Sequence, residues 1–210
     1  MDDRLIVVEH PVLAERLVVL RDRATLHGAF RRALHEASAI LAIEATRDLP
    51  TRDVTVDTPL EPANGDRVLG DVTVVPVLRA GLGMVEGFLQ LLPEARVGHL
   101  GMQRDEEELT PVDYYERLPP DLADAHVFVV DPMLATGGSA VHALDRLKEA
   151  GAQRLRLITL VCAPEGVEAV HGAHPDVTIW TAALDARLDD RGYIRPGLGD
   201  AGDRAFGTQG

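Results

Sequence analysis

The chain has 210 residues, 46% of them hydrophobic, and carries a formal net charge of −13. This composition predicts one folded domain over residues 1–210. It argues against broad nucleic-acid binding, which needs cations on phosphates, but not against a local basic pocket for a small anion. The sequence has no apolar run of 18 residues, so no membrane span is predicted. A lone Cys162 and a Met1-Asp2-Asp3-Arg4 start without signal-peptide layout favour the cytoplasm.

The first sixty residues are predicted to be a mainly helical packing region. Apolar residues recur at helical spacing in two segments, and short extended patterns flank them. The expected elements are a strand at 5–8, helices at 12–22 and 27–47, and a strand at 51–58. Thr25 is the expected cap of the longer helix. The amphipathic pattern of the longer helix suits covering the sheet, and packing against the core with contacts between subunits is equally compatible.

A buried strand is predicted at Val72–Leu78, followed by the turn Arg79-Ala80-Gly81-Leu82-Gly83 and a helix over 84–92. Small residues at such a turn leave backbone N–H groups accessible, and Arg79 adds a cation. A lone arginine on a turn is more often only solvated. Its place at the end of a buried strand nevertheless makes it a candidate anion ligand.

Residues 95–102 are predicted to form a further strand, and a charged stretch follows it. That stretch begins at Gln103-Arg104 and contains three consecutive glutamates, so its simplest interpretation is a solvated loop. Tyr114 and Tyr115 come later and suit either the support of such a loop or ordinary packing of a hairpin.

The most informative stretch begins with the buried strand Val127–Val130 and the single acid Asp131 at its carboxyl end. A loop of small residues, 135–139, then opens a helix that is predicted to run to Ala150. Gly151 stands where a helix often ends on a glycine. Strand, acid, glycine-rich turn and helix start follow one another without a gap.

This arrangement suits a phosphate. The first N–H groups of a helix have no intrahelical partner, and the helix dipole is positive there. Gly137 and Gly138 allow close approach of an anion, and Thr136 and Ser139 add hydroxyl donors. The alternative is a tight turn capped by Ser139. The stretch lacks the Gly-Lys-Ser/Thr of a Walker A loop and the glycine spacing of a dinucleotide fold.

The last third is predicted to contain a strand at 155–161, a short helix ending near 171 and a final strand at 177–182. Cys162 lies in apolar strand context, which favours a buried inert thiol. The tail, 185–210, is not predicted to be helical. It mixes Pro, aromatic residues and glycines, a composition that suits an ordered binding loop.

The motif Asp-Pro-Met-Leu-Ala-Thr-Gly-Gly-Ser at residues 131–139 resembles the phosphoribosyl-pyrophosphate (PRPP) loop of type I phosphoribosyltransferases. Most of these enzymes carry a second acid where this chain has Pro132, a variation of the uracil phosphoribosyltransferase family. Three further blocks resemble the same family: Pro76–Met84, the segment around Arg104, and the tail from Gly192 to Thr208. The resemblance thus covers nearly the whole chain.

The resemblance implies an α/β type I phosphoribosyltransferase fold: a mainly parallel sheet flanked by helices, with a uracil-binding C-terminal hood at 185–210. It implies catalytic roles for Asp131, Arg79 and Arg104. The implied PRPP ligands are Arg79, Arg104, Asp131, Pro132, Met133, Leu134, Ala135, Thr136, Gly137, Gly138, Ser139 and Asp200. The implied uracil ligands are Ile194, Gly199, Asp200 and Ala201.

Several finer expectations follow from the same resemblance. Asp200 contacts either uracil N1 or the ribose region. The segment around Arg104 closes over PRPP as a flexible arm. A strained or cis peptide is expected next to Arg79, and the Arg195 side chain, at a position that is usually hydrophobic, is expected to point outward.

The implied reaction joins uracil and PRPP into UMP and diphosphate, with Mg²⁺ held through PRPP and water and without a protein metal ligand. GTP is a candidate activator, because it activates some members, and a homodimer or larger homo-oligomer is expected. Two alternatives stay open: a phosphoribosyltransferase for another base, and a uridine-nucleotide-dependent RNA-binding regulator on the same fold. The acidic charge and the complete hood argue against the regulator.

Overall fold

The main sheet runs through the centre of the molecule. The computed structural model describes residues 3–104 and 111–208. Within these residues nine strands build the sheet: β1 (Leu5–Val7), β4 (Val72–Leu78), β5 (Arg96–Val97), β6 (His99–Arg104), β7 (Pro111–Arg117), β8 (His126–Val130), β9 (Met133–Leu134), β10 (Arg154–Cys162) and β11 (Thr178–Leu184). Their order is β1-β11-β10-β8-β4-β6-β7, with β5 beside β4 and β9 beside β10. Only β6 and β7 pair antiparallel, so the predicted mainly parallel sheet is confirmed.

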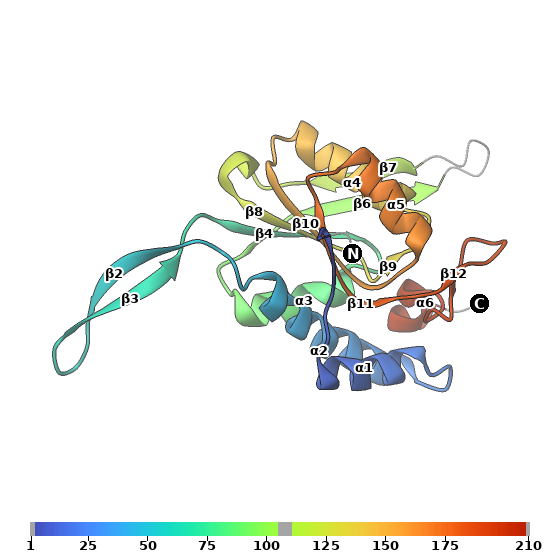
Figure 1. Cartoon of the computed structure of the whole chain (residues 1–210), viewed down its shortest axis with the longest axis horizontal. Helices are drawn as coiled ribbons and strands as arrows, with labels where there is room; N and C mark the ends of the chain where they lie inside the picture. The colour runs from blue at the N-terminus through green and yellow to red at the C-terminus, as the bar shows by residue number, and fades with distance from the viewer. Residues whose placement is uncertain (1–2, 105–110, 209–210) are drawn as a thin grey trace.

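Helices cover both faces of this sheet (Figure 1). Five of them are α1 (Pro11–Arg21), α2 (His27–Ala45), α3 (Leu82–Leu91), α4 (Gly138–Glu149) and α5 (Pro164–Ala173). Side chains alternate across a strand, so Phe128 packs into the core under α1, α2 and α3, while Val127 and Val129 pack into a second core under α4 and α5. Both faces of β8 are therefore buried, as its unbroken apolar sequence predicts.

The N-terminal region differs from the expectation in two places. Residues 51–58 do form a strand, β2 (Thr51–Asp57), but it pairs with β3 (Pro62–Val68) in a separate exposed hairpin that projects from the molecule instead of covering the sheet (Figure 1). β3 was not predicted because its Asn64-Gly65 pair is typical of a turn. Thr25 does not cap α2. Its hydroxyl donates to the Val19 carbonyl, and Leu26 is the N-cap residue.

The tail also differs from the expectation. It contains a small hairpin, β12 (Arg187–Leu188) with β13 (Ile194–Arg195), and a short helix, α6 (Ala201–Phe206). The prediction of a tail without helix is therefore wrong. Asp200 caps α6 by accepting from the Asp203 N–H, and Gly207 ends it with φ +70°. The spacing between these two residues was a readable helix signal.

The sheet brings the functional loops to one edge. The register pairs Val130 with Pro76 on one side and with Ile158 on the other, all in parallel. The loop after β4 and the loop after β8 therefore leave the sheet side by side, at its carboxyl edge. Within the part of the chain that the structure describes, no helix is long and apolar enough to cross a membrane.

Gly87 provides a test of the packing between α2 and α3. A Cβ added there would lie 2.7 Å from the Ala39 nitrogen and 2.8 Å from the His35 oxygen, both backbone atoms. Gly87→Ala is therefore expected to lower the free energy of unfolding by about 1–3 kcal/mol. At the helical Gly172, an added Cβ would meet nothing within 4 Å. Gly172→Ala should leave stability unchanged or raise it by up to about 1 kcal/mol. Urea denaturation measures both, and equal effects would contradict the packing argument.

Candidate active site

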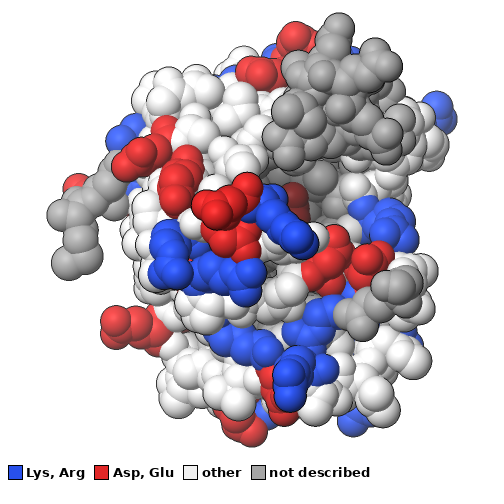
Figure 2. Space-filling model, turned by 90° about the vertical axis from the view of Figure 1, so that its right-hand side faces the viewer, with Lys and Arg blue, Asp and Glu red and all other residues white. Residues whose placement is uncertain are grey.

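A cavity of about 630 Å³ lies at the carboxyl edge of the sheet. Its walls come from three segments: the turn after β4, the loop and helix start after β8, and the tail. We call these the Arg79 loop (78–83), the phosphate loop (131–139) and the hood (185–208). Figure 2 shows the face of the molecule that bears the hood, where acidic and basic side chains are interspersed around a recess.

The phosphate loop leads into a helix whose N-terminus has no side-chain cap. Helix α4 begins at Gly138, after an N-cap Gly137 with φ +86°, and no side chain hydrogen-bonds to its N-terminus. The expected alternative, a turn capped by Ser139, is therefore wrong. Ser139 is the second residue of the helix, is exposed and lines the cavity. A helix N-terminus without a side-chain cap keeps its N–H donors available to a ligand.

Glycine is required where this loop crosses the start of α5. A Cβ on Gly137 would lie 2.7 Å from the Ala169 Cβ, and a Cβ on Gly166 would lie 2.4 Å from the Ala135 oxygen. Contacts that short do not occur, so both positions must lack a side chain. The close crossing fixes the loop against β10 and α5, which gives a rigid cradle.

Asp131 begins the phosphate loop, and its side chain accepts a hydrogen bond from the backbone of the same loop. Its Oδ1 accepts from the Met133 N–H at 3.2 Å, while Pro132 between them is buried and its carbonyl accepts from the N–H groups of Leu160 and Val161. Burial raises the pKa of Asp131 to about 7; the Met133 N–H opposes this rise, and the negative charge of Asp200 adds to it. Two carboxyl groups thus face one cavity.

The Arg79 loop contains the expected unusual peptide: the Leu78–Arg79 bond is cis. Gly81 lets this loop approach β8, because a Cβ there would lie 2.4 Å from the Val130 oxygen. The Arg79 side chain reaches the hood, where it lies 3.1 Å from an Asp203 oxygen and 3.4 Å from the Thr208 hydroxyl. It is about half exposed. Arg79 is therefore tied to the hood by contacts that a ligand anion can replace.

The hood surrounds the far side of the cavity with backbone. Gly197 and Gly199 have φ +62° and +77°, and the Arg195–Pro196 bond is cis. The Arg195 side chain is exposed and pairs with Asp189, as its expected outward orientation predicts, while the residue also lines part of the cavity. Asp200 caps α6 and lines the cavity.

The structure brings most of the predicted site residues to this cavity. Those that line it are Arg79, Asp131, Met133, Leu134, Ala135, Thr136, Gly137, Gly138, Ser139, Ile194, Gly199 and Asp200. Pro132 and Ala201 are buried behind the wall. The Arg104 backbone belongs to β6, and the placement of its side chain, like residues 105–110 of the expected flexible arm, lies outside the described part.

Several lining residues were not predicted as ligands, among them Met102, Arg191 and Tyr193. Arg191 and Tyr193 flank Gly192 at the tip of the β12–β13 hairpin, so their closeness to the hood motif was the available signal. Cys162, in contrast, behaves as expected. Its thiol is buried and donates to the Ala183 carbonyl, and burial raises the pKa of the thiol to about 11.

The raised pKa of Asp131 gives a stability prediction. A carboxyl titrates near 4 in an unfolded chain, so between about pH 4 and 7 the folded protein binds the extra proton. Asp131 therefore destabilises the ligand-free fold progressively as pH rises through this window, and the loss levels off above pH 7. Asp131→Asn should raise stability by about 1–3 kcal/mol at pH 8 and by much less at pH 5. Melting curves check this against Asp57→Asn on the exposed hairpin; a gain independent of pH would contradict it.

Comparison with known proteins agrees with this geometry. A family model described as uracil phosphoribosyltransferase matches residues 7–208. Two uracil phosphoribosyltransferases are similar to the chain: that of Salinibacter ruber, 56% identical over 99% of both chains, and that of Halalkalibacterium halodurans, 52% identical over 98% and 99%.

Solved structures agree as well. The AQ2163 protein from Aquifex aeolicus superposes with a TM-score of 0.92 at 35% identity, over 96% of this chain and 97% of that one. A hypoxanthine-guanine phosphoribosyltransferase from Bacillus anthracis shares the fold at 13% identity and a TM-score of 0.53, over 73% and 80%. With the match spanning nearly its whole length, the chain belongs to the uracil phosphoribosyltransferase family.

Proposed function

We propose that this enzyme transfers the phosphoribosyl group of PRPP to N1 of uracil, giving UMP and diphosphate. The observation that carries the proposal is one cavity that joins an uncapped helix N-terminus, the acid Asp131 and a glycine-rich backbone hood. A phosphate, a ribose and a planar base need these three surfaces. The family relationship supports the same reaction.

The 5-phosphate of PRPP is assigned to the start of α4. Backbone N–H groups at Gly137–Ser139 and the Thr136 hydroxyl converge there, and the helix dipole favours the negative charge. Asp131 lies beside this site and is assigned to the ribose hydroxyls. Burial and the charge of Asp200 raise its pKa, so a metal ion that arrived with the substrate would favour its ionised form.

Asp131 and Asp200 also fit Mg²⁺ near the ribose and diphosphate. Carboxylate oxygens are the ligands that Mg²⁺ prefers, and it usually retains water and substrate phosphates in its shell. Among the described residues no group of three His, Cys, Asp or Glu side chains could hold a metal. The ion is therefore assigned to PRPP and water, next to these acids. When bound, it would neutralise charge on the leaving diphosphate.

Arg79 and Arg104 are assigned to the diphosphate. Arginine binds phosphate oxygens in a bidentate manner and stays charged. The Arg79 guanidinium contacts Asp203 and Thr208 in the hood. A bound diphosphate would replace these two residues as its hydrogen-bond partner. The enzyme then stabilises negative charge on the leaving group as the ribose C1–oxygen bond breaks.

The new bond forms between uracil N1 and ribose C1 while the N1 proton is lost and the diphosphate leaves with the electrons of the broken bond. No protein nucleophile is required, and Cys162 is buried in the core with a raised pKa. Catalysis is therefore assigned to positioning and charge stabilisation.

Recognition of uracil is assigned to the backbone at Ile194, Gly199 and Ala201. A fixed N–H opposite O4 and a fixed carbonyl opposite N3–H accept uracil, whereas cytosine would present a donor to the donor and an acceptor to the acceptor. Each unpaired buried polar group costs about 1–3 kcal/mol, so two mismatches exclude cytosine. A backbone reader explains why the hood needs glycines with positive φ.

A base assay tests the reaction. Purified protein is given PRPP and Mg²⁺ with uracil, cytosine or hypoxanthine, and product nucleotides are separated by chromatography. We expect UMP from uracil alone, loss of turnover with EDTA, and a fall in kcat of about 10²-fold or more for Asp131→Ala. GTP is added in a parallel series as the candidate activator.

Arg187→Ala is the matched control, because this exposed arginine lies in the hood and does not line the cavity. It should keep uracil turnover within about threefold of the wild type. Equal turnover with hypoxanthine would favour an enzyme for another base. No turnover with any base, together with UMP-dependent retardation of RNA, would favour the RNA-binding regulator.

The homodimer or larger homo-oligomer is proposed to depend on the β2–β3 hairpin. This hairpin projects from the sheet, and Leu60 at its tip is 95% exposed, which is unusual for a large apolar side chain. The protein is proposed to work in the cytoplasm, where its single thiol stays reduced.

Removal of the hairpin tests this assembly. Thr51 and Val68 are paired neighbours, so replacing residues 52–67 with Gly-Gly closes the gap with a two-residue turn. Light scattering should then give the mass of a single shortened chain, which is below 22.7 kDa, and a multiple of 22.7 kDa for the wild type. An unchanged assembly in the shortened protein would place the interface elsewhere.

A further inference from the structure

The hood is attached to the N-terminal helices by two arginines that the assignments above do not use. Arg21 is the last residue of α1, and Arg204 lies in α6. Both reach across more than 160 residues of sequence to bind backbone groups. Neither lines the cavity, so neither is placed to touch a substrate.

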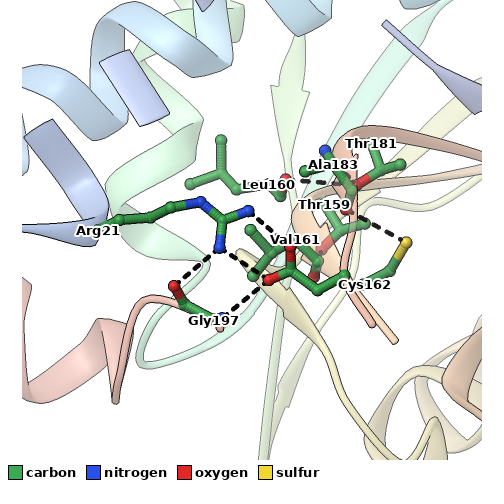
Figure 3. Close-up of polar contacts among 9 residues, drawn as sticks. Arg21, Thr159, Leu160, Val161, Cys162, Thr181, Ala183 and Gly197 are labelled. Carbon is green, nitrogen blue, oxygen red and sulfur yellow. Dashed lines mark hydrogen bonds and ion pairs between the residues drawn. The ribbon is translucent and has the colours of Figure 1, made fainter. Parts of the chain in front are cut away.

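Arg21 and Asp185 form a bidentate pair at the base of the hood. The two guanidinium nitrogens lie 2.6 and 2.9 Å from the two carboxylate oxygens of Asp185, whose side chain is only 5% exposed. The same pair holds both polar groups of one hood residue. Arg21 donates to the Gly197 carbonyl at 3.0 Å, and the Gly197 N–H donates to Asp185 at 2.9 Å. Figure 3 shows the Arg21 guanidinium turned toward this carbonyl.

Arg204 binds the backbone of the residue that follows Gly197, which is Leu198. It is 9% exposed and lies over the Phe30 ring, 4.5 Å from the centroid. It donates to the Leu198 carbonyl at 2.7 Å, and also to the carbonyls of Leu20 and Asp22 at the end of α1. Three backbone polar groups of two consecutive residues, the Gly197 N–H and the carbonyls of Gly197 and Leu198, are thus bound by charged side chains.

These three groups lie between Ile194 and Gly199, two of the backbone positions assigned to uracil. Gly197 has φ +62° and follows a cis proline, and by itself a glycine has wide conformational freedom. A backbone reader discriminates bases only if its N–H and carbonyl are held in place before binding. The charged contacts supply that restraint, because hydrogen bonds to ionised groups are stronger than neutral ones.

We propose that Arg21, Asp185 and Arg204 are positioning residues for base recognition, which couple the C-terminal end of α1 to the uracil-reading backbone of the hood. This inference rests on the proposed function, since it assigns the base to the hood. It predicts an effect on uracil and not on PRPP, because the phosphate loop is fixed separately by its crossing with α5.

Arg21→Ala tests the proposal by steady-state kinetics with each substrate varied in turn. We expect the KM for uracil to rise about tenfold or more while the KM for PRPP stays within about twofold. Arg16→Ala is the matched control. Arg16 lies on the same helix with similar exposure and pairs with Glu36 at 2.8 Å, away from the hood. It should behave as the wild type.

Arg21→Ala leaves the buried Asp185 without its partner, and this variant could fail to fold for that reason. A second variant with a neutral pair at both positions keeps the test valid in that case. The double variant Arg21→Gln, Asp185→Asn removes both charges together and retains an acceptor for the Gly197 N–H. We expect the same rise in the KM for uracil. An unchanged KM for uracil in a folded variant, or equal rises for uracil and PRPP, would overturn the proposal.

Hydrogen exchange separates this inference from the proposed function. The amide of Gly197 should exchange slowly in the wild type and in Arg16→Ala, and at least about tenfold faster in the Arg21 variants. This readout needs no turnover. If the wild type formed no UMP, the reaction would be wrong while the restraint could still be measured. Equal exchange in all variants would overturn the restraint whatever the activity.

Discussion

The parallel pairing of β4, β8 and β10 is the constraint on which the site depends. Because Pro76, Val130 and Ile158 share one register, the chain leaves adjacent strands at the same edge and the two ligand loops open side by side. Burial on both faces fixes this register, since a slip of one residue would exchange the two cores. The cavity follows from where the strands end, before any polar side chain is considered.

Two kinds of rigidity then shape the cavity. The phosphate loop is held by close backbone packing, with glycines at Gly137 and Gly166 where no side chain fits. The hood packs apolar side chains such as Ile194 and Leu198 into the core, and its backbone is bound by the charged side chains of Arg21 and Arg204. Arg79 links the Arg79 loop to the hood through its contact with Asp203. The phosphate and base halves of the site are therefore stabilised by different interactions.

Much of this architecture was predictable from the sequence. The apolar runs at β4, β8 and β10 predicted buried strands, and the glycine-rich loop after Asp131 predicted an anion site, because local patterns encode both. The parallel arrangement of the strands was implied by the family resemblance. The fold class and the family were confirmed, and so were the cis peptide before Arg79 and the outward Arg195.

Other features were not predicted, because they depend on contacts between distant residues or are too short to show a pattern in the sequence. The β3 strand contains Asn64-Gly65, a turn signal overridden by pairing with β2. The helix in the hood is only six residues long, too short for periodicity to reveal, so only the spacing of its end residues Asp200 and Gly207 signals it. The Arg21–Asp185 pair joins residues 164 positions apart, and neither residue stands in a motif.

That separation has a consequence for the order in which the protein is made. Strands β4 and β8 and the phosphate loop are complete well before the last residues leave the ribosome. The hood is not, because its contacts join the two ends of the chain, with Arg204 bound to the Leu20 carbonyl 184 positions away. Contacts between distant residues form late in folding. A chain cut short before Arg204 would thus retain the elements of the phosphate site without a fixed place for the base.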